Sequence, residues 1–187
     1  MANTEEQEFI NNYDMSKYDR PSLTADVIVF RGESVLMVRR KNHPSKHKLA
    51  FPGGFVENGE SAERAAVREL KEETGLDVTR LKQLCFVSTP HRDPRGWITT
   101  AVFTATSEGE PLAADDALEA AFFPVKLCGD TLYVGDVASK LNLVYDLNGD
   151  VDINNSTCDD NLAFDHAKIL AFALKRRKDE EKQLQNS

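Results

Sequence analysis

Three glutamates stand close together near the middle of this chain and could bind a metal ion. Glu69, Glu72 and Glu73 fall in a segment that predicts a helix, with Ser61 as its N-cap and Gly75 as the residue that ends it. Their charges repel one another at the negative end of the helix dipole, which costs roughly a few tenths of a kcal/mol for each placement. Hard divalent cations such as Mg²⁺ prefer carboxylate oxygens and substrate phosphates as ligands. A bound cation would turn this repulsion into attraction.

The residues around the cluster favour a binding site over the alternative, which is a solvated face of a surface helix. The Pro52-Gly53-Gly54 turn precedes the helix and allows close approach of the backbone, and Arg68 can pair with Glu72 one turn later. One stripe of small and apolar side chains predicts the helix face that packs on a core. It consists of Ala62, Ala65, Ala66 and Leu70. The glutamates then border a buried surface.

This window resembles the signature of the Nudix hydrolases, which fixes residue types at set spacing. The matching residues are Gly54, Glu60, Arg68, Glu69, Leu70, Glu72, Glu73, Gly75 and Leu76. So many fixed positions make the match far more specific than a lone glycine motif. The resemblance implies hydrolysis of a nucleoside diphosphate linked to some other moiety.

The resemblance also implies roles for individual residues. The implied ligands of Mg²⁺ or Mn²⁺ are Glu69, Glu72, Glu73 and the carbonyl oxygen of Gly54. Glu72 or Glu73 could instead accept the proton of the attacking water. Arg68 would orient a glutamate, and Glu60 belongs to the same catalytic set. The water would attack phosphorus directly, without a covalent intermediate.

The composition predicts one domain that acts on small anionic molecules. A chain of 187 residues with 41% hydrophobic content can bury one sizeable core. The net charge of −8 offers no basic surface for a phosphate backbone, so nucleic acid is not an expected partner. We also expect no membrane partner and a cytoplasmic location, because no apolar run approaches the roughly 20 residues of a span and the polar start lacks a signal-peptide core.

The cysteines predict neither a disulfide framework nor a zinc site. Cys85, Cys128 and Cys158 are odd in number and widely scattered, without the spacing of metal ligands. We expect three free thiols, with Cys85 in the core of a strand.

Strand-like and helical segments alternate along the chain, which favours an α/β fold. The predicted strands cover residues 23–30, 34–39, 81–88, 97–105 and 120–125, and a final helix covers 164–178. The resemblance implies a Nudix α/β/α sandwich with a mixed β-sheet. We expect an N-terminal arm at 1–20, one domain at 21–178, a hairpin-like insertion at about 128–160 around Asn148-Gly149, and a C-terminal tail at 179–187.

Three further stretches are similar to the Nudix branch that cleaves ADP-ribose, including domains fused to nicotinamide mononucleotide adenylyltransferases. They cover residues 13–24, 91–97 and 162–169. The resemblance implies ADP-ribose as substrate, AMP and ribose 5-phosphate as products, and a homodimer. Two features depart from the pattern. Leu49 stands where many relatives carry tryptophan, and the segment 127–160 is longer than the short link that usually precedes the last helix.

Four residues outside the signature are candidates for substrate binding: Arg40, Arg92, Asp93 and Arg95. Arg92 and Arg95 suit a diphosphate or a terminal ribose phosphate, because a guanidinium binds phosphate oxygens in bidentate fashion. The alternative is a salt bridge between Asp93 and Arg95 that only shapes a turn.

Other chemistry-bearing side chains allow two interpretations each. His166 could act as a base, but a histidine at the start of an apolar helix is more often a packing residue, which we favour. Trp97 or Phe51 could stack on adenine, although aromatic residues beside strands usually belong to the core. A second acidic group either supplies a further ligand or base, or lies in a solvated loop. It consists of Asp115, Asp116 and Glu119.

Two other functions compete with hydrolysis of ADP-ribose. A Nudix hydrolase could act on another dinucleotide or nucleotide sugar, because the signature specifies the chemistry and not the attached group. A non-catalytic ADP-ribose sensor is the rival from another class, since Nudix-related repressors resemble the same branch. Those repressors carry a winged-helix region after the Nudix domain, whereas this chain ends soon after its last helix, and its glutamates are intact. We therefore favour the enzyme.

Overall fold

A computed structural model describes residues 4–113 and 117–185 of the chain. Within them, ten strands form one sheet, in agreement with the predicted α/β fold. The strands are β1 (Ser22–Arg31), β2 (Ser34–Arg40), β3 (Leu49–Ala50), β4 (Gly53–Phe55), β5 (Val78–Val87), β6 (Ile98–Ser107), β7 (Ala117–Cys128), β8 (Thr131–Val134), β9 (Val137–Asn142) and β10 (Thr157–Cys158). The helices are α1 (Thr4–Asn12), the short 3₁₀ turn η1 (Met15–Lys17), α2 (Ala62–Thr74) and α3 (His166–Gln185).

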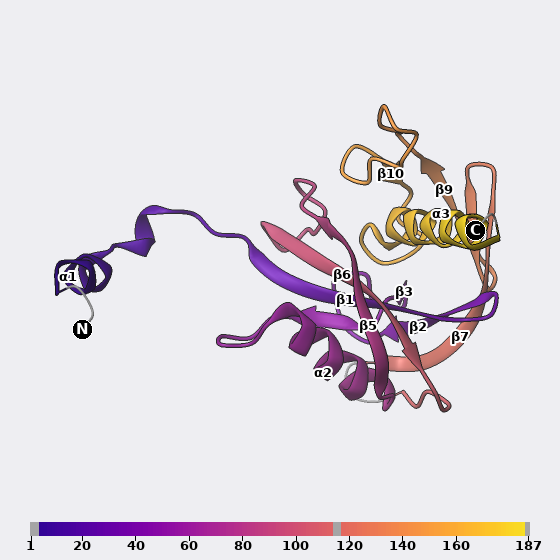
Figure 1. Ribbon diagram of the computed structural model, residues 1–187. Helices are drawn as coiled ribbons and strands as arrows, with labels where there is room; N and C mark the ends of the chain where they lie inside the picture. Colours follow the sequence, from indigo (N-terminus) through magenta and orange to yellow (C-terminus); the bar gives the residue numbers. More distant parts are fainter. Residues whose placement is uncertain (1–3, 114–116, 186–187) are drawn as a thin grey trace.

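The sheet is mixed, as expected, and α2 and α3 cover its two faces (Figure 1). Its strand order is β10-β9-β8-β7-β2-β1-β6-β5, with β3 paired to β2 and β4 paired to β1. Strand β1 runs parallel to β6 and antiparallel to β2. The result is the α/β/α sandwich with a mixed sheet that the resemblance implies.

Strand β1 is the centre of the fold because both of its faces are buried. Ala25, Val27 and Val29 belong to the apolar cluster that contains α2, whereas Ile28 belongs to the cluster that contains α3. Successive side chains of a strand point to opposite faces, so a continuous apolar run is what a strand between two layers requires. Polar residues on this strand are therefore exceptional.

The turn that precedes α2 is inserted between the two central strands. β1 and β2 pair directly only at their hairpin end, through Phe30 and Arg31. Farther along, β3 pairs with β2 and β4 pairs with β1, and the Val27 N–H donates to the Pro52 carbonyl at 2.9 Å. The Pro52-Gly53-Gly54 turn consequently lies at the middle of the sheet rather than at its margin.

The signature helix forms where the sequence predicts it. The Ser61 hydroxyl accepts from the Arg64 N–H at 3.3 Å, and Gly75 adopts the left-handed conformation at φ 70°. These are the side-chain N-cap and glycine C-terminal position expected from the residue types. Its buried stripe includes Ala65, Ala66 and Leu70.

The last helix is longer than predicted. α3 continues beyond residue 178 to Gln185, so most of the expected tail is helical. Ion pairs give these last turns partners: Glu181 receives a hydrogen bond from Arg177 at 3.0 Å, and Glu180 one from Lys82 of β5 at 2.8 Å. Charged composition alone does not reveal such pairing between distant segments.

The insertion also differs in detail from the expectation. The paired hairpin of this insertion is formed by β8 and β9. It precedes Asn148-Gly149, where the centre of the hairpin was predicted. Asn148-Gly149 does form a turn, but only the isolated bridge between Tyr145 and Val151 closes it. β7 is likewise longer than the predicted strand at 120–125, because its far end pairs with β8.

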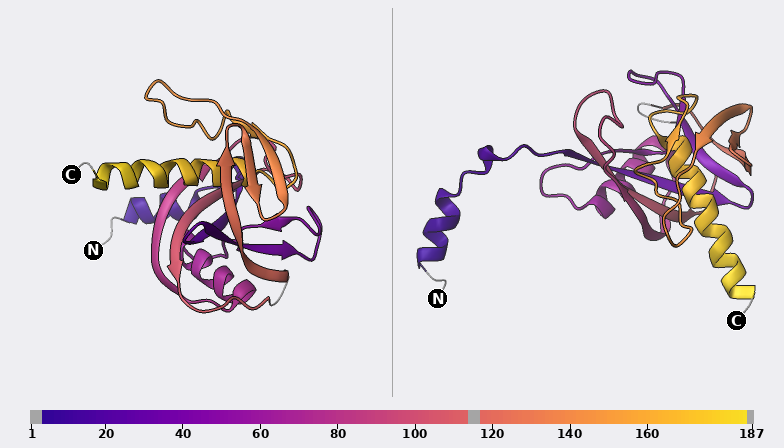
Figure 2. Two further views of the ribbon diagram at one scale, coloured as in Figure 1. Left: turned by 90° about the vertical axis from the view of Figure 1, so that its right-hand side faces the viewer. Right: turned by 90° about the horizontal axis from the view of Figure 1, so that it is seen from above.

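The N-terminal arm lies away from the body of the molecule (Figures 1 and 2). Helix α1 buries none of its residues. Across the part of the chain that the structure describes, no helix is long and apolar enough to span a membrane.

The buried stripe of α2 should contribute strongly to stability. We expect Leu70→Ala, which empties a site with 0% exposure, to lower the free energy of unfolding by about 3 kcal/mol through lost burial and a cavity. Val67→Ala on the exposed side of the same helix should change it by less than about 1 kcal/mol. Urea unfolding of both variants tests this, and equal effects would contradict the packing described.

Candidate functional site

The Pro52-Gly53-Gly54 turn brings two carboxylates of α2 against the backbone. The Gly53 N–H donates to Glu73 Oε2 at 3.1 Å. A Cβ atom added at Gly54 would overlap the carboxylate of Glu69. The lack of a side chain at Gly54 therefore leaves the space that Glu69 occupies.

Arg68 gathers the remaining carboxylates around one guanidinium. It donates to both oxygens of Glu60 at 3.0 Å, to Glu69 at 2.7 Å and to Glu72 at 3.1 Å, so the predicted pair with Glu72 is confirmed. It also donates to the Phe55 carbonyl at 3.0 Å. The hydrogen bonds from Arg68 hold the pKa of Glu60 below its ordinary value, and the carboxylates in turn raise the pKa of Arg68.

Burial opposes ionisation of the other two carboxylates. It raises the pKa of Glu73 to about 8, and the nearby charge of Glu69 adds to this effect. The pKa of Glu69 is also raised, mainly by burial, although Arg68 acts against the shift. A carboxylate with a raised pKa gains a great deal from a neighbouring positive charge, because that charge favours the ionised form.

The donor chemistry of this group fits a hard divalent cation, since it supplies carboxylates and backbone carbonyls. No three Asp, Glu, His or Cys side chains within residues 4–113 and 117–185 stand in a ready arrangement around one metal position. Arg68 accounts for this, because it draws Glu69 and Glu72 toward its own guanidinium while Glu73 faces Gly53. A shared metal ion at Glu69, Glu72, Glu73 and the Gly54 carbonyl stays a prediction.

Two arginines lie on the other side of the same cleft. Arg40 and Arg95 stand over the Phe164 ring, at 5.0 and 5.4 Å from its centroid, and Arg95 also stands over Phe55 at 4.9 Å. Burial and then the charge of Arg95 lower the pKa of Arg40. These arginines and the glutamates line one cleft of about 390 Å³. An anion between the guanidiniums would relieve their repulsion.

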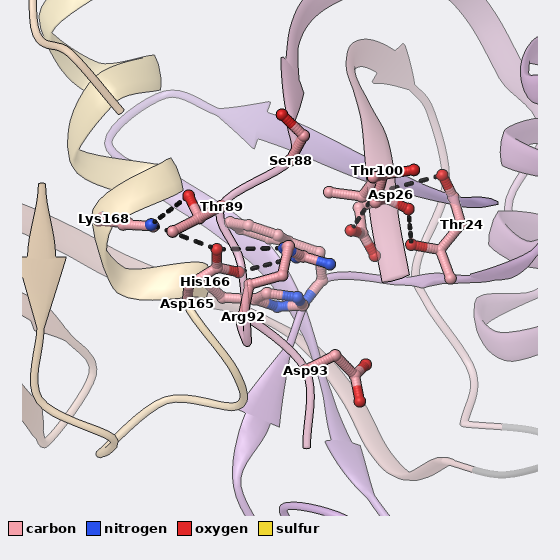
Figure 3. A network of polar contacts seen from close by, with 12 residues as sticks. Thr24, Asp26, Ser88, Thr89, Arg92, Asp93, Thr100, Asp165, His166 and Lys168 are labelled. Carbon is pink, nitrogen blue, oxygen red and sulfur yellow. Dashed lines mark hydrogen bonds and ion pairs between the residues drawn. The ribbon is translucent and has the colours of Figure 1, made fainter. Parts of the chain in front are cut away.

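The other two substrate-binding candidates have protein partners, and Figure 3 shows that of Arg92. Arg92, whose side chain is only 3% exposed, donates to both oxygens of Asp165 at 2.7 and 3.1 Å. Asp93 accepts from the side chain and the backbone N–H of Arg95, which is the turn-shaping salt bridge considered as an alternative. This geometry gives the buried Arg92 and Asp93 positioning roles. Arg95 is paired with Asp93, but its side chain is 38% exposed and lines the cleft, so Arg40 and Arg95 are the better candidates for direct contact.

The packing role favoured for His166 is confirmed. Its Nδ1 accepts from the Phe51 N–H at 3.0 Å, and the two rings stack at 4.5 Å. Burial lowers the pKa of His166. Of the two interpretations left open for each aromatic residue, Phe51 takes the core position, at 2% exposure, whereas Trp97 is 57% exposed and is not a core residue. Trp97 stands just before β6, where its ring is not enclosed by the sheet.

Glu119 and the three cysteines are not among the residues that line the carboxylate cleft. Glu119 accepts from Arg39 at 2.8 Å on the β2–β7 pair, so it has a structural partner. Asp115 and Asp116 lie outside the described residues. The three cysteines are free thiols, and burial raises the pKa of Cys85 to about 12.

Sequence reasoning missed two residues that line this region. Asp26 is 93% buried within β1, at 7% exposure, and an acid inside an apolar strand could have signalled it. Phe164 supports both arginines from a backbone at φ 51°. Such a conformation is a rare strain for a bulky residue and recurs at functional sites, but no residue type predicts it.

Comparison with known proteins agrees with the geometry. The family model of the NUDIX domain matches residues 20–135, which is more than half of the chain. The chain belongs to the Nudix family. Its fold is the Nudix fold.

Several Nudix proteins are similar over most of this chain. The ADP-ribose pyrophosphatase of Methanocaldococcus jannaschii is 38% identical over 169 residues, which cover 88% of this chain and 81% of that protein. The crystal structure of a MutT/nudix family protein from Enterococcus faecalis is 34% identical, with a TM-score of 0.76, and the match covers 96% of this chain and 70% of that one.

A bifunctional protein also supports the expected branch. The NMN adenylyltransferase/ADP ribose pyrophosphatase of Francisella tularensis, complexed with AMP and a manganese ion, is 30% identical with a TM-score of 0.51. The match covers 63% of this chain and 37% of that one.

The space beside Gly54 should be needed for metal binding by this Nudix protein. Gly54→Ala should displace the flexible Glu69 carboxylate and weaken Mn²⁺ binding roughly tenfold or more, with little effect on folding. Val67→Ala is the control, because it changes an exposed side chain of α2 that lies outside the cleft. Calorimetric titration that found equal Mn²⁺ affinity in both variants would contradict this arrangement.

The raised pKa of Glu73 predicts that metal affinity depends on pH. Below about pH 8 this carboxyl carries a proton that a cation must displace, so Mn²⁺ affinity should rise by about tenfold per pH unit from pH 6 and level off above about 8. Glu73→Gln, which has no such proton, should bind Mn²⁺ weakly and lack this slope. Titrations in buffers of different ionisation enthalpy would also detect the released proton; wild-type affinity that stays constant over this range would argue against Glu73 as a ligand.

Proposed function

We propose that this Nudix hydrolase splits the diphosphate of ADP-ribose into AMP and ribose 5-phosphate, using Mg²⁺ or Mn²⁺. The observation that carries the proposal is the pairing of opposite charges across one cleft: Arg40 and Arg95 on one side, and the α2 carboxylates on the other. A diphosphate can contact the guanidiniums directly and the carboxylates through a bound cation. The similarity to ADP-ribose pyrophosphatases supports the choice of substrate.

The residues of the chain have distinct roles in this proposal. A bound divalent ion would supply positive charge at the diphosphate and lower the pKa of a coordinated water. Glu69, Glu72 and Glu73 would hold it, with the Gly54 carbonyl as a neutral ligand. Arg68 would keep Glu69 and Glu72 aligned through its hydrogen bonds, and Glu60 would hold Arg68 from the opposite side.

The chemical step needs one proton acceptor. Water oxygen bonds to one phosphorus, the bond from that phosphorus to the bridging oxygen breaks, and Glu72 or Glu73 accepts the water proton. Arg40 and Arg95 would hold the phosphate groups while negative charge moves onto the departing oxygen. The products are two phosphate monoesters, and no covalent intermediate forms.

The same cleft would also accept other nucleotide sugars, because the carboxylates and arginines recognise a diphosphate and not the groups attached to it. A sensor that binds ADP-ribose without cleaving it is the rival from another class. The complete carboxylate set favours the enzyme, because a sensor gains nothing from Glu69, Glu72 and Glu73 held at one cleft. We retain from the resemblance a homodimer, which light scattering can test. A cytoplasmic location stays an expectation from the sequence.

Incubation with a panel of nucleoside diphosphate derivatives tests the proposed function. With Mg²⁺ or Mn²⁺, ADP-ribose should be consumed fastest and give AMP and ribose 5-phosphate in equal amounts, as identified by chromatography. A chelator should abolish turnover, and added metal should restore it. Faster turnover of another compound would overturn the substrate, and activity that survives exhaustive chelation would overturn the metal-dependent chemistry. Tight binding of ADP-ribose without any turnover would favour the sensor.

A further inference from the structure

A second opening joins the carboxylate cleft on the α3 side of the Pro-Gly-Gly turn. It measures about 60 Å³ and shares Arg40, Gly53, Gly54, Phe55 and Arg95 with the cleft. Its remaining polar lining comes from β1, from the loop before β6 and from the start of α3, which Figure 3 shows together. These residues are Thr24, Asp26, Arg92, Asp93 and His166. A water molecule needs about 10 to 15 Å³ by this measure, so the opening accommodates a few hydroxyl-sized groups.

One oxygen in this opening has no protein donor. Asp26 Oδ2 accepts from the Thr100 hydroxyl at 2.6 Å, whereas Oδ1 accepts no hydrogen bond from the residues that the structure describes. Oδ1 lies beside Gly53, where an added Cβ would come within 2.6 Å of it. The Asp26 side chain is largely buried, at 7% exposure, but Oδ1 is not fully enclosed and faces the opening. A group that enters the opening can therefore donate a hydrogen bond to Oδ1.

The charges around Asp26 favour a neutral donor. Arg92 and Arg95 are each paired with a carboxylate, Asp165 and Asp93, so these charges cancel locally. Arg40 donates to the Pro44 carbonyl and has no carboxylate partner among the described residues. Asp26 opposes entry of a bare phosphate, and the arginines oppose a bare cation.

A sugar hydroxyl satisfies both kinds of neighbour. It donates one hydrogen bond, to a carboxylate, and accepts others, from a guanidinium. The rings of Phe51, Phe55 and Phe164 also line the opening and offer apolar faces to the carbon-bound hydrogens of a sugar. Phosphate groups held at Arg40 and Arg95 would place an attached ribose next to this opening.

We propose that Asp26 binds a hydroxyl of a ribose that is attached to the diphosphate, and that this opening is a sugar-hydroxyl subsite. The inference rests on the proposed function for the position of the diphosphate. Either ribose of ADP-ribose carries the required chemistry, and the experiment distinguishes the two.

Asp26→Asn tests the subsite, because the amide preserves the volume and can still accept from Thr100, while a donating NH₂ group replaces Oδ1. The substrates are ADP-ribose and two analogues, one without the 2- and 3-hydroxyls of the adenosine ribose and one without those of the terminal ribose. The wild-type protein should lose roughly 10- to 100-fold in kcat/KM with one analogue, mostly through KM, and this identifies the bound ribose. Asp26→Asn should lose as much with ADP-ribose and should not discriminate against that analogue.

The control variant is Asp130→Asn, which alters an exposed carboxylate paired with Lys140 on the β8–β9 hairpin and should behave as wild type. If Asp26→Asn discriminates between ADP-ribose and that analogue in kcat/KM as strongly as the wild type does, the proposal is overturned. An equal loss with all three substrates would assign Asp26 to folding or catalysis and would also overturn it. Calorimetric binding of the same compounds without metal gives the same comparison, so the subsite is tested even where ADP-ribose is bound and not hydrolysed.

Discussion

The insertion of residues 49–55 between β1 and β2 is the constraint on which the site depends. If the two strands paired along their whole length, no backbone would face the end of α2. Because the Val27 N–H bonds the Pro52 carbonyl instead of a β2 residue, the chain enters the sheet and leaves again within a few residues. Gly53 and Gly54 then present backbone groups to Glu73 and Glu69, and α2 starts close by at a fixed angle to the sheet.

A second constraint is the balance of charge around Arg68. The carboxylates of Glu60, Glu69 and Glu72 would repel one another, but the single guanidinium of Arg68 contacts all three. Glu73 stays outside this group and is the most strongly destabilised anion, as its raised pKa shows. The cluster is therefore held in shape while one carboxylate retains a strong preference for a positive partner.

The start of α3 connects the two halves of the cleft. Asp165 holds Arg92 of the loop before β6, and the adjacent His166 accepts from Phe51, immediately before the Pro-Gly-Gly turn (Figure 3). Lys168 adds a contact to Thr89 at 3.2 Å. Two loops that are far apart in the sequence are thus fastened to one helix end, so Arg95 and the α2 carboxylates keep their relative positions.

The sequence by itself determined the features that local residue types control. Runs of β-branched and apolar residues predicted β1, β2 and β6. Ser61 and Gly75 predicted the ends of α2, because capping depends on the residues at those positions. The spacing of Glu69, Glu72 and Glu73 likewise identified the cluster, since a helix places such residues on neighbouring turns. Only the tertiary structure decided which charged groups are free: Arg92 is bound by Asp165, Arg95 by Asp93, and Asp26 keeps one oxygen without a donor. The pair of Arg92 and Asp165 joins residues 73 positions apart. No local pattern in the chain shows which distant residues folding brings into contact.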